Sequence, residues 1–180
     1  YAVVIGYDRN EEIIYLHSGS RRNEKLSFRV FNNTWARSGF WGLLVLPSSQ
    51  MPVSTDYRKW LDAAVGLELA GQWRAAAAAY EKAGEQWPQS ANIWIGLGNS
   101  RFALHDLPGA ARAFEKAIKN RPDSGVAYNN LAKTLAAMGH YEKGLAAARH
   151  AVMLGGPFLE QFRNTLAETK EEIPSSPVSP

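Results

Sequence analysis

The chain has 180 residues and no cysteine, and its 20 basic and 17 acidic residues give it a net charge of +3. The lack of cysteine excludes disulfides, thiolate metal sites and a cysteine nucleophile from this chain. A charge this small does not by itself indicate nucleic acid or a membrane as a partner, and no apolar run approaches the ~18 residues of a membrane span.

The first 46 residues predict a small β-rich α+β segment, because apolar and β-branched runs alternate with turn residues. The expected elements are a buried strand at residues 1–7, a second strand at 12–17, a polar loop at 18–25, a helix at 28–37 capped by Ser27, and a third strand at 40–46. Such a short segment cannot bury a good core alone. Since the chain opens inside a strand-like run at Tyr1, we expect it to be a fragment or a processed form.

Residues 47–56 have the composition of a linker, with two prolines and several hydroxyl residues. Asp56 stands where a side chain could cap the helix that follows. Far downstream, residues 159–173 predict one amphipathic helix with an apolar face made by Phe158, Leu159, Phe162 and Leu166. The proline- and serine-rich residues 174–180 predict a disordered tail.

Between the linker and this last helix, three consecutive segments align without gaps. They span residues 57–90, 91–124 and 125–158, each 34 residues long. The fourth place is aromatic, as Trp60, Trp94 and Tyr128, and the eighth is small, as Ala64, Gly98 and Ala132. Further matched sets are Ala76, Ala110 and Gly144 at the twentieth place; Tyr80, Phe114 and Ala148 at the twenty-fourth; and Ala83, Ala117 and Ala151 at the twenty-seventh.

This register resembles the tetratricopeptide repeat (TPR) family, in which a 34-residue helix–turn–helix unit stacks into a solenoid. The resemblance implies a mainly α fold: a three-repeat TPR α-solenoid with a capping helix, preceded by the β-rich segment. Gly71, His105 and Gly139 fall at the hairpin turns, where a helix often ends in a left-handed residue. The alternative is an unrelated alanine-rich helical bundle, which would need no fixed period.

Residues 1–46 carry a second resemblance. The runs YAVVIGYD, EEIIYLHSG, LSFRVFNNTW and GFWGLLVL are similar to the C-terminal half of C39-like cysteine peptidases, which have a papain-like fold. The resemblance implies a catalytic Cys and His upstream of residue 1. It also places Ser18, after His17, where the family has an orienting Asp, and a serine cannot hold an imidazolium as a carboxylate does. The alternative is a small β-rich cap on the solenoid without catalytic ancestry.

The TPR resemblance implies a concave ligand groove lined by the first helix of each repeat. Carried over position by position, it gives Arg58, Leu61 and Val65 in repeat one, Asn92, Asn99 and Phe102 in repeat two, and Asn129 and Lys133 in repeat three. Asparagine both donates and accepts hydrogen bonds, so it suits an extended peptide backbone, and Lys133 could meet a carboxylate. The open alternative is that Asn99 and Asn129 are neutral positions on a solvated face.

TPR domains that capture chaperone tails clamp the terminal carboxylate with Lys, Asn and Arg. The matching positions here hold Leu61, Val65, Gly96, Val126 and Asn130. Without the charged clamp, capture of a chaperone C-terminal tail is not expected.

No catalytic set is evident in the sequence. The four histidines, His17, His105, His140 and His150, share no helix at metal-ligand spacing, and no phosphate-binding glycine loop occurs, so no metal or cofactor is expected. We therefore expect a non-catalytic module that binds a protein or peptide in the TPR groove. The alternative is the C-terminal part of a C39-like cysteine peptidase with the solenoid as scaffold, and a bacterial envelope location follows from that resemblance alone.

Overall fold

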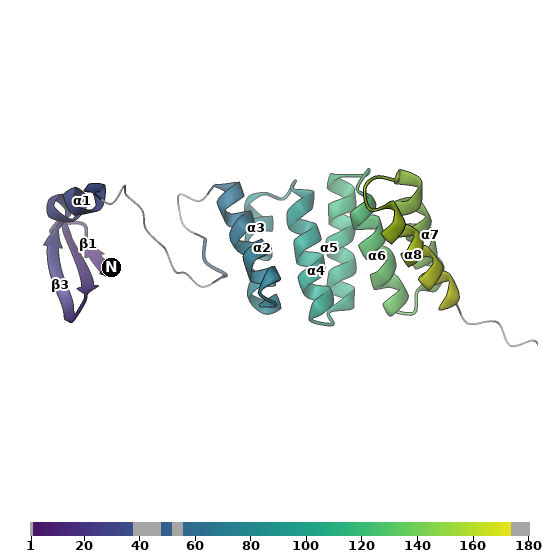
Figure 1. Cartoon of the computed structure of the whole chain (residues 1–180), viewed down its shortest axis with the longest axis horizontal. Helices are drawn as coiled ribbons and strands as arrows, with labels where there is room; N and C mark the ends of the chain where they lie inside the picture. Colours follow the sequence, from purple (N-terminus) through teal and green to yellow (C-terminus); the bar gives the residue numbers. More distant parts are fainter. Residues whose placement is uncertain (1, 38–47, 52–55, 174–180) are drawn as a thin grey trace, which may run out of the picture. The chain divides into compact units, whose positions relative to one another are not determined.

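The computed structural model describes residues 2–37, 48–51 and 56–173. The chain divides into two compact units, Tyr1–Val45 and Leu46–Pro180 (Figure 1). The first contains β1 (Ala2–Asp8), β2 (Ile13–Ser18), β3 (Arg21–Ser27) and α1 (Phe28–Arg37). The second contains α2 (Tyr57–Leu69), α3 (Trp73–Gln86), α4 (Ala91–Ala103), α5 (Leu107–Asn120), α6 (Gly125–Ala137), α7 (Tyr141–Leu154) and α8 (Leu159–Glu171). Over the described ranges, no helix combines the length and apolarity that crossing a membrane requires.

The first unit is an antiparallel sheet in the order β1-β2-β3, followed by α1. The predicted hairpin of β1 and β2 is confirmed, and so is the helix, whose first turn is capped by the Ser27 hydroxyl at 3.4 Å from the Val30 amide nitrogen. The predicted strand at residues 40–46 lies outside the described residues. Leu16 is buried in this unit.

Two predictions for this unit are wrong. The polar loop at residues 18–25 is largely strand β3, which pairs with β2 beyond a turn at Gly19, where φ is +59°. Strand pairing uses backbone groups, so it can occur without an apolar pattern. The first strand is not buried either: Tyr7 is 66% exposed, and Val3, Val4 and Ile5 are exposed with it.

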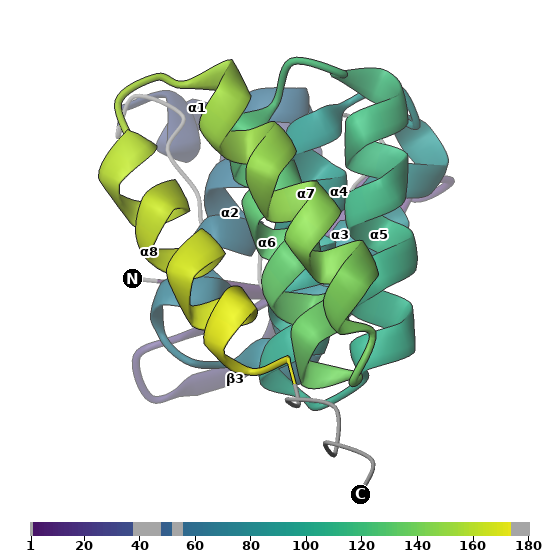
Figure 2. The ribbon, with the colours of Figure 1, turned by 90° about the vertical axis from the view of Figure 1, so that its right-hand side faces the viewer.

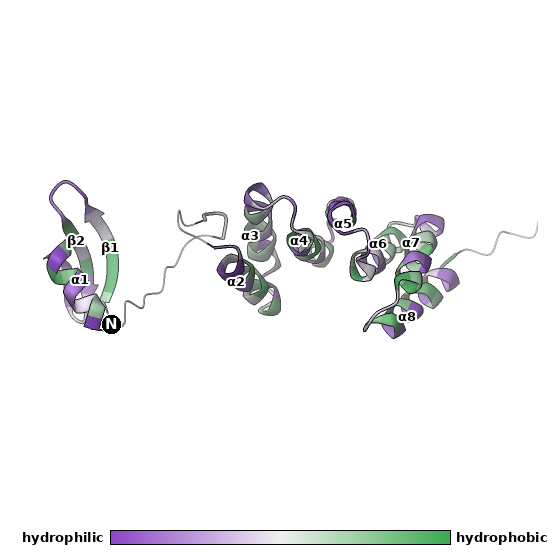
Figure 3. Ribbon diagram, turned by 90° about the horizontal axis from the view of Figure 1, so that it is seen from above, coloured by the Kyte–Doolittle hydropathy of each residue, from purple (hydrophilic) through white to green (hydrophobic). Residues whose placement is uncertain are grey.

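The second unit consists of antiparallel helix pairs that stack side by side (Figures 1 and 2). Helices α2, α4 and α6 begin at Tyr57, Ala91 and Gly125, which are the first residues of the three aligned segments. Asp56 caps α2 as predicted, because its carboxylate accepts from the Arg58 and Lys59 amides at 2.8 and 3.1 Å. Hydrophobic and hydrophilic residues both occur along the helices of this unit (Figure 3).

Small residues at fixed places let the paired helices approach closely. The matched alanines, glycines and aromatics at the eighth, twentieth, twenty-fourth and twenty-seventh places of the segments are all buried. The two glycines of α4 make room for aromatic rings. A Cβ atom on Gly96 would lie 2.2 Å from the Tyr80 ring, and one on Gly98 would lie 2.4 Å from the Phe114 ring. These two glycines therefore have a packing role.

The predicted hairpin turns have the expected left-handed residues. Gly71 has φ of +68° and Gly139 has φ of +77°. At the corresponding place of the second pair His105 has φ of +61°, a conformation that glycine adopts without steric cost. Of the three hairpin turns, the second therefore has a residue other than glycine at the left-handed position.

Helix α8 packs against α6 and α7 at the end of the row (Figure 2). Phe162 is buried, and Leu166 packs on the core as predicted. Phe158 was expected on the same face but is exposed, because it precedes the first helical turn and lies outside the helical periodicity. Thr165 and Thr169 are buried instead.

The helices form two layers that differ in spacing. The first helices contact one another directly, α2 with α4, α4 with α6, and α6 with α8. Among the described residues, the second helices α3, α5 and α7 make no comparable contact with each other. In a curved stack the closer-spaced layer is the inner one, so the layer of α2, α4, α6 and α8 forms the concave side.

Candidate functional site

The predicted groove residues lie on the concave layer, on α2, α4 and α6. Their exposure differs, and it divides them into three groups. Arg58, Val65, Asn92, Phe102 and Lys133 are exposed, Leu61 and Asn99 are partly buried, and Asn129 is buried. Leu61 packs against the core cluster around Tyr80. The Asn92 side chain accepts a hydrogen bond from Arg121 at 3.3 Å, so it is already engaged within the chain.

A chain of polar side chains links the three first helices. The Asn99 amide on α4 donates to the Glu68 carboxylate on α2 at 3.1 Å. The Asn130 amide on α6 donates to the Asn99 carbonyl at 2.9 Å. Each link joins residues that are 31 apart in the sequence. This separation is shorter than the 34-residue repeat by about one helical turn. We call Glu68, Asn99, Asn130 and Asn129 the polar ladder.

Asn129 ends the ladder with an unused acceptor. Its side-chain nitrogen lies 3.4 Å from the Asn130 side-chain oxygen, a long contact. Its residue is 6% exposed, and its Oδ1 atom has no hydrogen-bond partner among the described residues. A buried acceptor without a donor costs about 1–3 kcal/mol. Such an acceptor needs a donor from outside these residues, which is either a buried water or a bound ligand that moves the covering side chains aside.

The other end of the ladder is fixed by a buried tyrosine. The Tyr80 hydroxyl on α3 donates to the second Glu68 oxygen at 2.8 Å. Burial, the hydrogen bond to Glu68 and the charge of that carboxylate together raise the pKa of Tyr80 far above its ordinary value. Tyr80 therefore stays neutral, and its hydroxyl holds the Glu68 side chain in place.

This arrangement predicts an alkaline effect on stability. Because the pKa of Tyr80 is raised on folding, its contribution is fully present below the unfolded pKa of about 10 and is lost as the pH rises above it. Tyr80→Phe should lower the free energy of unfolding by roughly 1–1.5 kcal/mol at pH 8 and should flatten the decline above pH 10. Urea unfolding at pH 8 and at a pH above 10 measures both effects, with Tyr141→Phe as the control. An equal alkaline decline in Tyr80→Phe and wild type would contradict it.

An apolar edge accompanies the ladder on the same helices. Val65 and Leu69 on α2 and Phe102 on α4 are exposed. Val65 and Phe102 are two of the predicted groove residues, and Leu69 follows Val65 by one helical turn on α2. The concave layer therefore offers both unsatisfied polar capacity and apolar surface.

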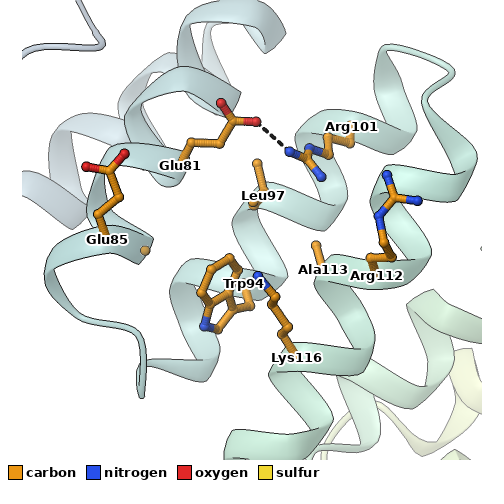
Figure 4. Close-up of a pocket in the computed structure, with 9 residues that line it drawn as sticks. Glu81, Glu85, Trp94, Leu97, Arg101, Arg112, Ala113 and Lys116 are labelled. Carbon is orange, nitrogen blue, oxygen red and sulfur yellow. Dashed lines mark hydrogen bonds and ion pairs between the residues drawn. The ribbon is translucent and has the colours of Figure 1, made fainter.

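A second candidate site lies between α3, α4 and α5 and was not predicted from the sequence. It is a cavity of about 300 Å³ with Trp94 at one wall and charged side chains from α3 and α5 around it (Figure 4). Lys116 and Trp94 are distant in sequence and come together only because α4 packs on α5. The aromatic fourth place was the one signal that pointed toward it.

Two of the four histidines make contacts within the chain. The His17 side chain accepts a hydrogen bond from the backbone N–H of Asn23 at 3.1 Å. His150 stacks on Tyr128 with ring centroids 4.1 Å apart. The described part of the chain holds no group of three or more His, Asp or Glu residues that could bind a metal ion.

The helical unit is an α-solenoid of stacked helical hairpins. Two family models described as tetratricopeptide repeat match it, over residues 61–125 and 113–146. Residues 61–146 are therefore tetratricopeptide repeats, as predicted. These matches do not include residues 1–46, so the peptidase resemblance stays a prediction. No curated protein sequence matches the chain.

Solved structures share the fold at low identity. The TPR2B domain of yeast Sti1 in its pHsp70 complex is 18% identical, with a TM-score of 0.60 over 63% of this chain and 98% of that chain. The Arabidopsis OM64 TPR domain is 17% identical, with a TM-score of 0.61 over 64% and 95%. The Yersinia enterocolitica type III secretion chaperone SycD, in complex with a peptide of the translocator YopD, is 16% identical, with a TM-score of 0.61 over 68% and 98%. These likenesses establish the fold.

Proposed function

We propose that the helical unit binds an extended segment of a partner protein on its concave layer and performs no catalysis. The observation that carries the proposal is the buried, unpartnered Asn129 acceptor at the end of the polar ladder. A peptide in extended conformation has backbone N–H groups that can donate hydrogen bonds to a neighbouring side-chain carbonyl. The structure of SycD with a YopD peptide gives a precedent within the fold.

The ladder and the apolar edge together suggest what the segment contains. Val65, Leu69 and Phe102 favour a segment with apolar side chains. In this proposal the Asn129 carbonyl accepts a hydrogen bond from the segment's backbone once the segment displaces the side chains that cover it. The places of the chaperone-tail clamp lack cations, so we do not propose a C-terminal chaperone tail as the ligand. We assign the repeats to residues 57–90, 91–124 and 125–158, with residues 159–173 as the capping helix.

Asn129→Ala gives the decisive test because it should weaken peptide binding without lowering the stability of the fold. Removing a buried carbonyl that lacks a donor, at the loss of only one long contact to Asn130, should leave the free energy of unfolding unchanged or raise it by up to about 1 kcal/mol. Removing the acceptor should weaken a bound peptide about tenfold, or about 1.4 kcal/mol. The ligand would be a heptapeptide selected from a random display library against the full chain and then synthesised, with calorimetry measuring its affinity.

Asn164→Ala is the matched control, since Asn164 is an exposed asparagine on α8 outside the ladder. It should leave the affinity within about twofold. If Asn129→Ala binds the selected peptides as tightly as wild type does, or if it loses stability as an ordinary core truncation would, the concave assignment is wrong.

For residues 1–46 we propose, as the alternative function, the C-terminal part of a C39-like cysteine peptidase. The hairpin of β1 and β2 followed by α1, and the exposed apolar residues of β1, support a segment that packs against further structure. The test is labelling of the natural, N-terminally complete protein with a thiol-directed peptidase probe. Labelling of one upstream cysteine would support an active peptidase, and an unlabelled folded protein would contradict it.

A further inference from the structure

The cavity between α3, α4 and α5 is separate from the proposed peptide groove. Its walls come from the second helices α3 and α5 together with one side of α4 (Figure 4), whereas the groove lies on the layer of first helices. Its volume of about 300 Å³ is at the lower end of the range for ligand sites. A space of this size holds one or two side chains of a partner better than a cofactor.

Trp94 makes a fixed aromatic wall in this cavity. Its indole N–H donates to the Pro88 carbonyl at 2.7 Å. Its ring lies against Gly84, where a Cβ atom would come within 2.8 Å of it. The Lys116 ammonium is 4.2 Å from the ring centroid, in the range of a cation–π contact. The wall therefore presents an apolar surface with a positive charge held above it.

The acidic residues of the cavity are neutralised within the chain. Glu81 pairs with Arg101 at 2.6 Å, and Arg101 also lies 3.8 Å from Asp106. Glu85 pairs with Lys82 at 2.5 Å. These ion pairs leave the positive charge of the α5 wall without compensation.

That positive charge comes from two side chains one helical turn apart. Arg112 and Lys116 occupy positions i and i+4 of α5, so they lie on the same face. Neither makes an ion pair within the described ranges. Guanidinium groups match carboxylates with two parallel hydrogen bonds, and ammonium groups add a point charge.

We propose that this cavity binds an acidic segment of a partner protein. A carboxylate of the segment is held by Arg112 and Lys116. A neighbouring apolar side chain packs against Trp94, Leu97 and Ala113, which complete the lining. The chain can then engage two peptide segments at once, one in the groove and one here.

The test uses two capped tetrapeptides as probes, acetyl-Glu-Leu-Glu-Glu-amide and its neutral counterpart acetyl-Gln-Leu-Gln-Gln-amide. Each is titrated into the full chain while NMR follows the indole N–H of Trp94, assigned with Trp94→Phe. The acidic probe should shift this signal to saturation, and the neutral probe should bind at least tenfold more weakly. Arg112→Gln and Lys116→Gln should each weaken the acidic probe about fivefold or more.

Lys143→Gln is the matched control, because Lys143 is an exposed lysine on α7 with no ion pair in the described part of the chain. It should change the affinity less than twofold. An equal loss of affinity in Lys143→Gln would mean that net charge alone causes the effect, and it would overturn the site. A Trp94 indole signal that does not move on titration would overturn it too. Shifts confined to the amides of Asn99 and Asn129 would place the acidic peptide in the groove, which overturns this site but leaves the proposed function standing.

Discussion

Phe114→Ala is expected to lower the free energy of unfolding by roughly 3–5 kcal/mol, the usual loss for a buried phenylalanine. Phe114 is 1% exposed. Its ring lies on Gly98 of α4 and belongs to the core cluster that joins α5 to Leu131 and Ala132 of α6. The substitution therefore opens a cavity where the second helix pair meets the third.

Urea unfolding followed by circular dichroism measures the loss. Phe102→Ala is the matched control, because Phe102 is 37% exposed on α4 and should cost less than about 1 kcal/mol. Comparable losses in the two variants would mean that Phe114 does not anchor the interface. In a repeat stack each unit is stabilised by its neighbours, so Phe114→Ala should also lower the m-value if α6 to α8 begin to unfold separately.

The repeats could be predicted from the sequence because helical hairpins are built from local contacts. Places that need a small residue, such as Ala64, Gly98 and Ala132, recur at the repeat period, and all three are buried as the spacing requires. The hairpin turns were predictable for the same reason, since a left-handed residue must follow each first helix. His105 shows that the position, more than the residue type, determines the conformation there.

The polar ladder could be predicted only in part. The repeat register placed Asn99 and Asn129 on the concave layer, but equivalent positions lie 34 residues apart, whereas the ladder joins residues 31 apart. That offset reflects how far neighbouring first helices slide along each other, which depends on packing across the whole interface. Asn130, which the register assigned to a clamp position, is for this reason the residue that bonds Asn99.

Two other features depended on structure that the sequence pattern does not show. Strand β3 has no apolar alternation, and backbone pairing with β2 makes it a strand. The cavity at Trp94 depends on Lys116, which comes from another helix. Both are contacts between elements, and a one-dimensional period carries no information about which side chains will face each other across them.

Gly98→Ala and Gly66→Ala, the same substitution on equivalent first helices, are expected to have opposite effects. Alanine is the better helix former by about 1 kcal/mol. A Cβ atom on Gly66 meets nothing within 4 Å, so Gly66→Ala should raise the free energy of unfolding by about 0.5–1 kcal/mol. A Cβ atom on Gly98 would lie 2.4 Å from the buried Phe114 ring, and overpacking of roughly 3 kcal/mol leaves a net loss of about 2 kcal/mol.

The double variant Gly98→Ala/Phe114→Leu tests whether the clash with the Phe114 ring causes this loss. Leucine is smaller than phenylalanine and leaves room for the new methyl group, so the two substitutions should compensate each other by about 1 kcal/mol or more. Urea unfolding of the four proteins of the cycle gives the coupling energy. If the two losses simply add, the ring is not what excludes a side chain at Gly98. Compensation would show that the eighth place of the second repeat is glycine because the twenty-fourth place of the same repeat is phenylalanine.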